Sequence, residues 1–72
     1  MEKTRAEHLA WCKRRALEYV EDGDLPNAIA SMGSDLSKHP ETKCDPHLVL
    51  AGAMDAQNGD AQAVRRWING FN

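Results

Sequence analysis

Two cysteines and two of the three histidines have the spacing of metal ligands in this 72-residue sequence. Cys44 and His47 are separated by two residues, and His8 and Cys12 lie four residues apart, which is about one helical turn. Thiolates and imidazoles are the usual ligands of structural Zn²⁺, and four of them complete a tetrahedral site if their two segments meet. The alternative is that Cys12 packs as a buried thiol on an apolar stripe and that His47 lies on a solvated first turn. We favour this alternative and expect no metal and no other cofactor.

Basic residues next to tryptophans form the second group with recognisable chemistry. Residues 13–15 are basic and follow Trp11, and two arginines precede Trp67. Arginines with stacking rings suit single-stranded nucleic acid, but 11 acidic residues outnumber 9 basic ones and no nucleic-acid-binding motif is present. Tryptophan and arginine are also enriched among the residues that dominate protein–protein interfaces. We therefore expect a partner protein and keep nucleic acid as the alternative. The expected contact residues are Trp11, Arg14, Arg15, Arg66 and Trp67.

No arrangement of side chains typical of catalysis is present. The histidines and the serines Ser31, Ser34 and Ser37 have no spacing that would join a nucleophile, a base and an orienting group, and there is no phosphate loop. The net charge of −2 gives no drive toward membranes. The charged N-terminus lacks the apolar region of a secretory signal, and no apolar run reaches the roughly 18 residues of a membrane span. We expect a cytoplasmic protein with free thiols that is not an enzyme.

Capping residues predict four helices. Thr4-x-x-Glu7 has the spacing of a capping box at the start of the first helix. Gly23 suits a helix end because it takes positive φ at no steric cost. Aspartates at the following helix starts are preferred N-caps, and Asp45-Pro46 adds a proline at the first helical position. The helices are expected over residues 5–22, 25–38, 46–57 and 61–69.

Apolar residues recur at intervals of three and four, which predicts the buried face of each helix. The expected buried positions are Leu9, Cys12, Ala16 and Val20, then Leu25, Ala28, Ile29, Met32 and Leu36, then Leu50, Ala51 and Met54, and finally Ala61, Val64, Ile68 and Phe71. We interpret Gly33, inside the second helix, as a place where another helix passes close. No alternating β-branched run predicts a strand. The fold class is therefore all-α, in a single helical domain over residues 1–72.

Small and bulky residues flank the first turn in a recognisable order. The positions concerned are Ala16, Tyr19, Gly23, Ala28, Met32 and Pro40. Their spacing resembles that of tetratricopeptide repeats, in which two antiparallel helices meet at such a turn. A shift of 36 residues also places Gly23-Asp24 over Gly59-Asp60. Because two hairpins are fewer than the three or so repeats that a solenoid needs, the resemblance implies a compact four-helix bundle built of two helical hairpins.

Almost the whole chain resembles a second group of proteins. "TRAEHLAWCKRRALEY", "ASMGSDLSKHPET" and "INGFN" are similar to segments of short, uncharacterised proteins encoded by tailed phages and prophages. The resemblance implies a genomic setting and the cytoplasm of a bacterial host cell, and it carries no functional residues. We expect a small protein-interaction module, an accessory factor that binds a host or phage protein, or a second copy of itself as a homodimer.

Charge along the first helix opposes the helix dipole. Glu18, Glu21 and Asp22 lie at its C-terminal end, where each negative charge is unfavourable by about a few tenths of a kcal/mol. Arg65 or Arg66 of the fourth helix could face these carboxylates, or a basic partner could bind them. Both possibilities stay open at the level of the sequence.

Overall fold

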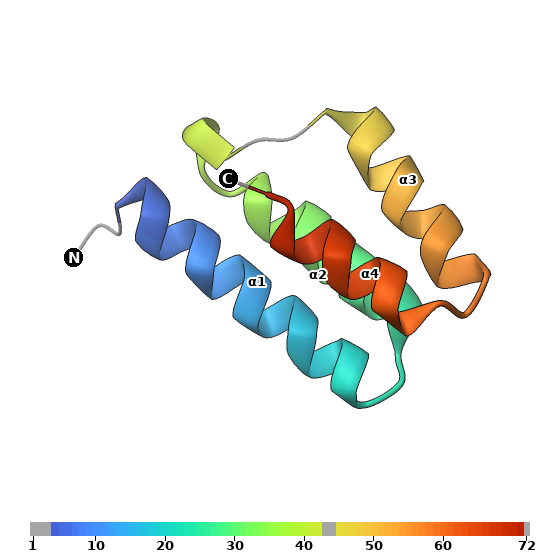
Figure 1. The fold of residues 1–72 in the computed structure, drawn as a ribbon. Helices are drawn as coiled ribbons and strands as arrows, with labels where there is room; N and C mark the ends of the chain where they lie inside the picture. Colours follow the sequence, from blue (N-terminus) through green and yellow to red (C-terminus); the bar gives the residue numbers. More distant parts are fainter. Residues whose placement is uncertain (1–3, 43–44, 72) are drawn as a thin grey trace.

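A computed structural model of the chain describes residues 4–42 and 45–71. The described residues form four α-helices and one short 3₁₀ helix, with no strand among them (Figure 1). The α-helices are α1 (Arg5–Glu21), α2 (Leu25–Leu36), α3 (Pro46–Gln57) and α4 (Ala61–Asn69), and the 3₁₀ helix η1 (Pro40–Thr42) precedes α3. The all-α prediction is confirmed, and each helix boundary lies within two residues of the predicted one.

The helices pack as a four-helix bundle made of two antiparallel hairpins. α1 and α2 form the first hairpin, and α4 lies against both of them. α3 contacts α2 and α4 and covers the remaining side (Figure 1). The α1–α2 turn and the α3–α4 turn lie at the same end of the bundle, at the lower right of Figure 1.

Side chains cap each α-helix at its N-terminus, as the sequence predicts. Thr4 and Glu7 form a reciprocal capping box, in which the Glu7 N–H donates to Thr4 Oγ1 over 3.1 Å. Asp24, Asp45 and Asp60 each accept a hydrogen bond from a backbone N–H two or three residues ahead. These bonds satisfy N–H groups that have no partner within the helix.

The two Gly-Asp turns have the same hydrogen bonds. Gly23 and Gly59 take φ values of +78° and +71°. In each turn the glycine N–H donates three residues back and the next aspartate N–H donates five residues back, with N···O distances of 2.9 to 3.2 Å. The 36-residue correspondence seen in the sequence therefore holds for the backbone at both helix ends.

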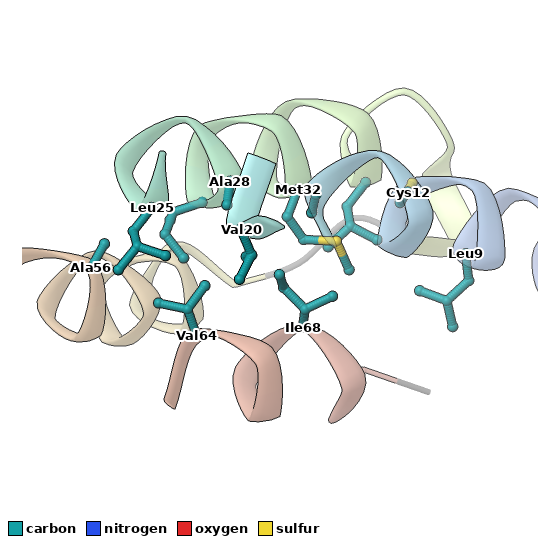
Figure 2. Close-up of a cluster of buried hydrophobic side chains, with 12 residues drawn as sticks. Leu9, Cys12, Val20, Leu25, Ala28, Met32, Ala56, Val64 and Ile68 are labelled. Carbon is teal, nitrogen blue, oxygen red and sulfur yellow. The ribbon is translucent and has the colours of Figure 1, made fainter. Parts of the chain in front are cut away.

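The core lies between α1, α2 and α4. Every predicted position of the first two stripes is buried, together with Val64 and Ile68. Figure 2 shows Val64 and Ile68 pointing from α4 toward side chains of α1 and α2. Phe71 is partly buried against the core. The prediction for Ala61 is wrong, because this first residue of α4 follows the turn directly and stays exposed.

The predicted inward face of α3 is also wrong. Leu50 and Met54 are 61% and 65% exposed, and Ala51 is exposed as well. Gly52 and Ala56 are the buried residues of this helix. α3 is apolar on nearly all sides, so its sequence has no unique stripe, and the small residues let it approach its neighbours more closely.

Close helix approach occurs at Gly52 more than at Gly33. A Cβ atom added at Gly33 would lie 3.6 Å from Val49 Cγ2, which is an ordinary van der Waals contact. A Cβ atom at Gly52 would lie 2.6 Å from Trp67 Cε2. A helix does pass Gly33, as predicted, but only Gly52 lies where a side chain would collide with its neighbour.

Candidate functional site

The five predicted contact residues fall into separate parts of the molecule. Trp11 and Arg15 belong to a polar cluster between α1 and α2. Arg14 is exposed and lines a hollow on α1 with Ala10 and Leu17. Arg66 and Trp67 line one groove between α3 and α4. The sequence pattern therefore grouped residues that the fold places in three separate parts of the molecule.

Asp35 is the centre of the polar cluster. Its side chain is 2% exposed and lies 2.7 Å from Arg15 Nε and 3.1 Å from Lys38 Nζ. Ser31 Oγ donates a third hydrogen bond over 3.4 Å. The two cations flank the Trp11 ring, with Arg15 Cζ 4.9 Å and Lys38 Nζ 5.5 Å from its centroid. Trp11 and Arg15 therefore have partners within the chain, and we assign them a structural role.

Ionisation of Asp35 is favoured by this setting. Burial by itself would raise the pKa of Asp35. The hydrogen bonds and positive charges of Lys38 and Arg15 outweigh burial, so the pKa of this carboxyl lies below its ordinary value. Asp35 is therefore a buried, ionised carboxylate that pairs with both Arg15 and Lys38.

His8 and Cys12, half of the possible zinc set, interact with the same cluster. His8 Nε2 lies 2.8 Å from the Asp35 carbonyl oxygen and 3.5 Å from Cys12 Sγ. Because a carbonyl only accepts, His8 Nε2 carries the proton and has no lone pair for a metal there. His47 is exposed and pairs with Asp45 Oδ1 over 3.0 Å.

Cys44 lies outside the described residues. Within the described part of the chain, no group of three or more potential ligands is arranged to hold a metal ion. The four-residue zinc site therefore stays a prediction.

A groove beside the end of α4, which we call the C-terminal groove, brings Arg66 and Trp67 together. It is lined by Leu48, Arg66, Trp67, Gly70 and Phe71. Trp67 Nε1 donates to the Leu48 carbonyl oxygen over 2.7 Å, and its ring meets Phe71 edge-on with centroids 5.0 Å apart. The face of the indole rests on Gly52. Trp67 is therefore a fixed wall rather than a freely moving side chain.

Arg66 is the one charged residue that lines the C-terminal groove. It is exposed, and it forms no ion pair with any residue in the ranges 4–42 and 45–71. Leu48, on the other wall, is 47% exposed. The groove thus combines an apolar lining with an exposed guanidinium that has no ion-pair partner among the described residues.

A second apolar surface lies over α3. Its outward side chains Leu50, Ala51 and Met54 form what we call the α3 ridge. Next to the ridge, a groove runs between α2 and α3, which we call the α2–α3 groove. The α2–α3 groove is lined by Pro26, Ile29, Ala30, Val49, Ala53, Ala56 and Gln57. No lining residue carries a charge.

The acidic end of α1 has no internal partner of the predicted kind. Among the residues that the structure describes, neither Arg65 nor Arg66 forms an ion pair with Glu18 or Glu21. The last turn of α1 also contains no basic residue. The internal pairing of these carboxylates with Arg65 or Arg66 is therefore absent among the described residues. Binding of a basic partner to the acidic end of α1 stays a proposal.

Sequence reasoning missed three features of these sites. Leu48 was not singled out, because the stripe chosen for α3 lay on another face. Phe71 was predicted as core, and it is partly buried while also lining the C-terminal groove. Asp35 had a usable signal, since it follows Ala28 and Met32 at intervals of four and three and so falls on the buried stripe.

Comparison with known proteins returned no match, whether to family models, to curated proteins or to solved structures. None of the helices in the described part of the chain has the length and apolarity needed to cross a membrane. Fold and site together define the class: a small four-helix bundle with two apolar surfaces on either side of α3.

Proposed function

We propose that the protein is a small protein-binding module that holds its partner in the C-terminal groove. One observation carries the proposal: Arg66, which forms no ion pair with any described residue, stands over an apolar groove walled by Trp67 and Phe71. Rigid aromatic walls with an adjacent arginine are the combination that dominates the free energy of many protein interfaces. Arg66 and Trp67 are also two of the five contact residues that the sequence predicts.

The chemistry of the groove favours a particular kind of partner segment. An apolar side chain fits between Leu48 and the two aromatic rings, and burial there stabilises the complex. A neighbouring carboxylate pairs with the Arg66 guanidinium, which has five donors in a fixed fork. The partner we propose is therefore a protein segment with an apolar residue next to an acidic one.

The setting of this function follows the resemblances of the sequence. We propose an accessory factor of a phage or prophage that acts in the cytoplasm of its bacterial host and binds a host or phage protein. The nucleic-acid alternative is less favoured, since Trp11 and Arg15 already interact with each other and with Asp35.

Selection from a random peptide library tests this proposal directly. We expect the immobilised wild-type protein to enrich peptides that carry an apolar residue beside Asp or Glu. These peptides should shift the indole N–H signal of Trp67 in the NMR spectrum, because that group lies in the groove wall. They should fail to bind the Arg66→Glu variant, in which charge complementarity is reversed.

The Arg14→Glu variant is the matched control. Arg14 is exposed on α1 and lines a different hollow, so the same charge reversal there should leave binding unchanged. Enriched peptides that bind Arg66→Glu as well as wild type, or a library that yields no enrichment, would refute the C-terminal groove as the binding site.

A further inference from the structure

The α3 ridge and the α2–α3 groove lie next to each other on one face of the molecule. Leu50 and Met54, which are 61% and 65% exposed, follow directly after Val49 and Ala53, which line the groove. The ridge and the groove therefore run side by side along the same helix. The ridge projects from the surface, the groove is a depression beside it, and both consist mostly of apolar side chains.

The exposure on this helix exceeds what an ordinary surface helix shows. A single exposed leucine is unremarkable in a folded protein. Here the segment from Pro46 to Met54 contains no Asp, Glu, Lys or Arg, and the ridge residues Leu50, Ala51 and Met54 are all exposed beside the apolar lining of the α2–α3 groove. A contiguous apolar patch of this kind marks an interaction surface.

We propose that this face is where two copies of the chain associate, with the α3 ridge of each copy seated in the α2–α3 groove of the other. A twofold interface uses the same patch on both subunits, so the patch must be complementary to itself. A ridge beside a groove of the same helix meets that condition. Ridges packed into grooves are also the usual way in which helices associate.

The surface charges favour this face over the acidic end of α1 as the place where two copies meet. The chain carries a net charge of −2, and carboxylates such as Glu18, Glu21 and Asp22 are exposed at the end of α1. Two copies that met through such a surface would repel each other. The ridge and the lining of the groove carry no charge, so two copies approach here without like-charge repulsion.

This self-association is separate from the proposed partner binding. The C-terminal groove lies between α3 and α4, and the α2–α3 groove lies on the opposite side of α3. A dimer formed through the α3 ridge leaves Arg66 outside the contact. Either proposal can therefore fail without the other.

Sedimentation velocity at low and high protein concentration, with a reductant present, tests the dimer. We expect the wild-type chain to sediment increasingly as a dimer as its concentration rises. Leu50→Lys, on the ridge, and Ala30→Glu, in the groove, should each raise the dimer dissociation constant by about tenfold or more, because each buries a charge without a partner. Both residues are exposed in the single copy, so the fold should persist, which circular dichroism can verify.

Mixing the two variants provides a test that misfolding cannot imitate. A dimer of one Leu50→Lys chain and one Ala30→Glu chain brings the new lysine to the new glutamate at one contact and leaves the other contact as in wild type. We expect the mixture to dimerise more tightly than either variant alone. Ala10→Glu, an exposed position on α1, should behave as wild type.

A wild-type chain that stays monomeric at the highest concentration overturns the proposal. A dimer that is indifferent to Ala30→Glu overturns it too, because the ridge would then pack against something other than the groove. Failure of the mixture to recover association has the same consequence.

Discussion

Asp35 shows how one residue joins two helices of this bundle. Its carboxylate lies between Arg15 of α1 and Lys38, which follows α2, and its carbonyl oxygen accepts from His8 of α1. Both cations remain about half exposed, at 45% and 58% of their side-chain surface. The two ion pairs therefore join a buried carboxylate to cations that remain partly hydrated.

Replacing Asp35 tests this interaction. We expect Asp35→Asn to lower the free energy of unfolding at neutral pH by about 1–2 kcal/mol, because charge-assisted hydrogen bonds are lost while the exposed cations stay solvated. Urea unfolding measures the difference. Asp22→Asn is the control, since Asp22 is exposed and its charge opposes the α1 dipole, so its loss should be neutral or slightly stabilising.

The same carboxylate predicts a pH dependence. Because the pKa of Asp35 is lower in the folded state than in the unfolded state, its contribution to stability is present above the unfolded value of about 3.9. The contribution is lost as the pH falls through the folded value. The difference in unfolding free energy between wild type and Asp35→Asn should therefore narrow between about pH 5 and pH 2. A difference that stays constant over that range would contradict an ionised Asp35.

Two glycines inside helices should respond to alanine with opposite sign. Gly52→Ala places a Cβ 2.6 Å from the indole of Trp67, which is held by its bond to Leu48. We expect it to lower the unfolding free energy by about 1–3 kcal/mol, because overpacking outweighs the gain in helix propensity. Gly33→Ala meets only an ordinary contact, so we expect it to be neutral or to stabilise by up to about 1 kcal/mol. Chemical unfolding of both variants measures these changes in unfolding free energy. A stabilising Gly52→Ala would show that α3 and α4 are not in close contact.

At the scale of elements, the two hairpins are built from the same turn but use it differently. The first turn joins two helices that each have one apolar stripe, and both stripes are buried. The second turn joins α3, which is apolar on nearly every side, to α4, whose Val64 and Ile68 enter the core. α3 therefore lies at the edge of the bundle with one face left outward.

α4 has nine residues and depends on its cap. The Asp60 carboxylate accepts from the Ala63 N–H over 3.0 Å. We expect Asp60→Ala to lower the free energy of unfolding by about 1 kcal/mol and to speed amide exchange within α4. Gln62→Ala, an exposed change in the same helix, should be neutral or slightly stabilising. Equal exchange rates in the two variants would show that the cap contributes little.

At the scale of the whole molecule, the bundle is held by apolar packing and by the Asp35 cluster. Of the described residues in the possible zinc set, His8 donates from Nε2 to a carbonyl and His47 pairs with Asp45 through Nδ1. We therefore keep the expectation that no metal is needed to join the helices.

A chelator should therefore leave the thermal unfolding curve unchanged. Structural zinc supplies the free energy of folding in domains that need it, so removing it would unfold them. We expect the same melting temperature with and without chelator, and for wild type and Cys44→Ser. A lower melting temperature with chelator would instead support a site that includes Cys44.

Helix ends, the buried faces of α1 and α2, and the Val64 and Ile68 face of α4 were determined by the sequence alone. Capping depends on contacts between residues no more than a few positions apart, as between Thr4 and Glu7 or Gly59 and Ala56, so the neighbouring residues contain all the information. The stripes of α1 and α2 are separated from polar residues on every turn, so only one face can be buried.

The inward face of α3, and with it the candidate surfaces, was decided only by the tertiary structure. Gly52 faces inward because Trp67, which lies fifteen residues further along the chain, rests on it. Whether a tryptophan beside arginines lines a groove, as Trp67 does, or interacts within the chain, as Trp11 does, depends on the helix opposite. Such choices arise from contacts between distant segments, and a helix that is apolar all round contains no local signal to select among them.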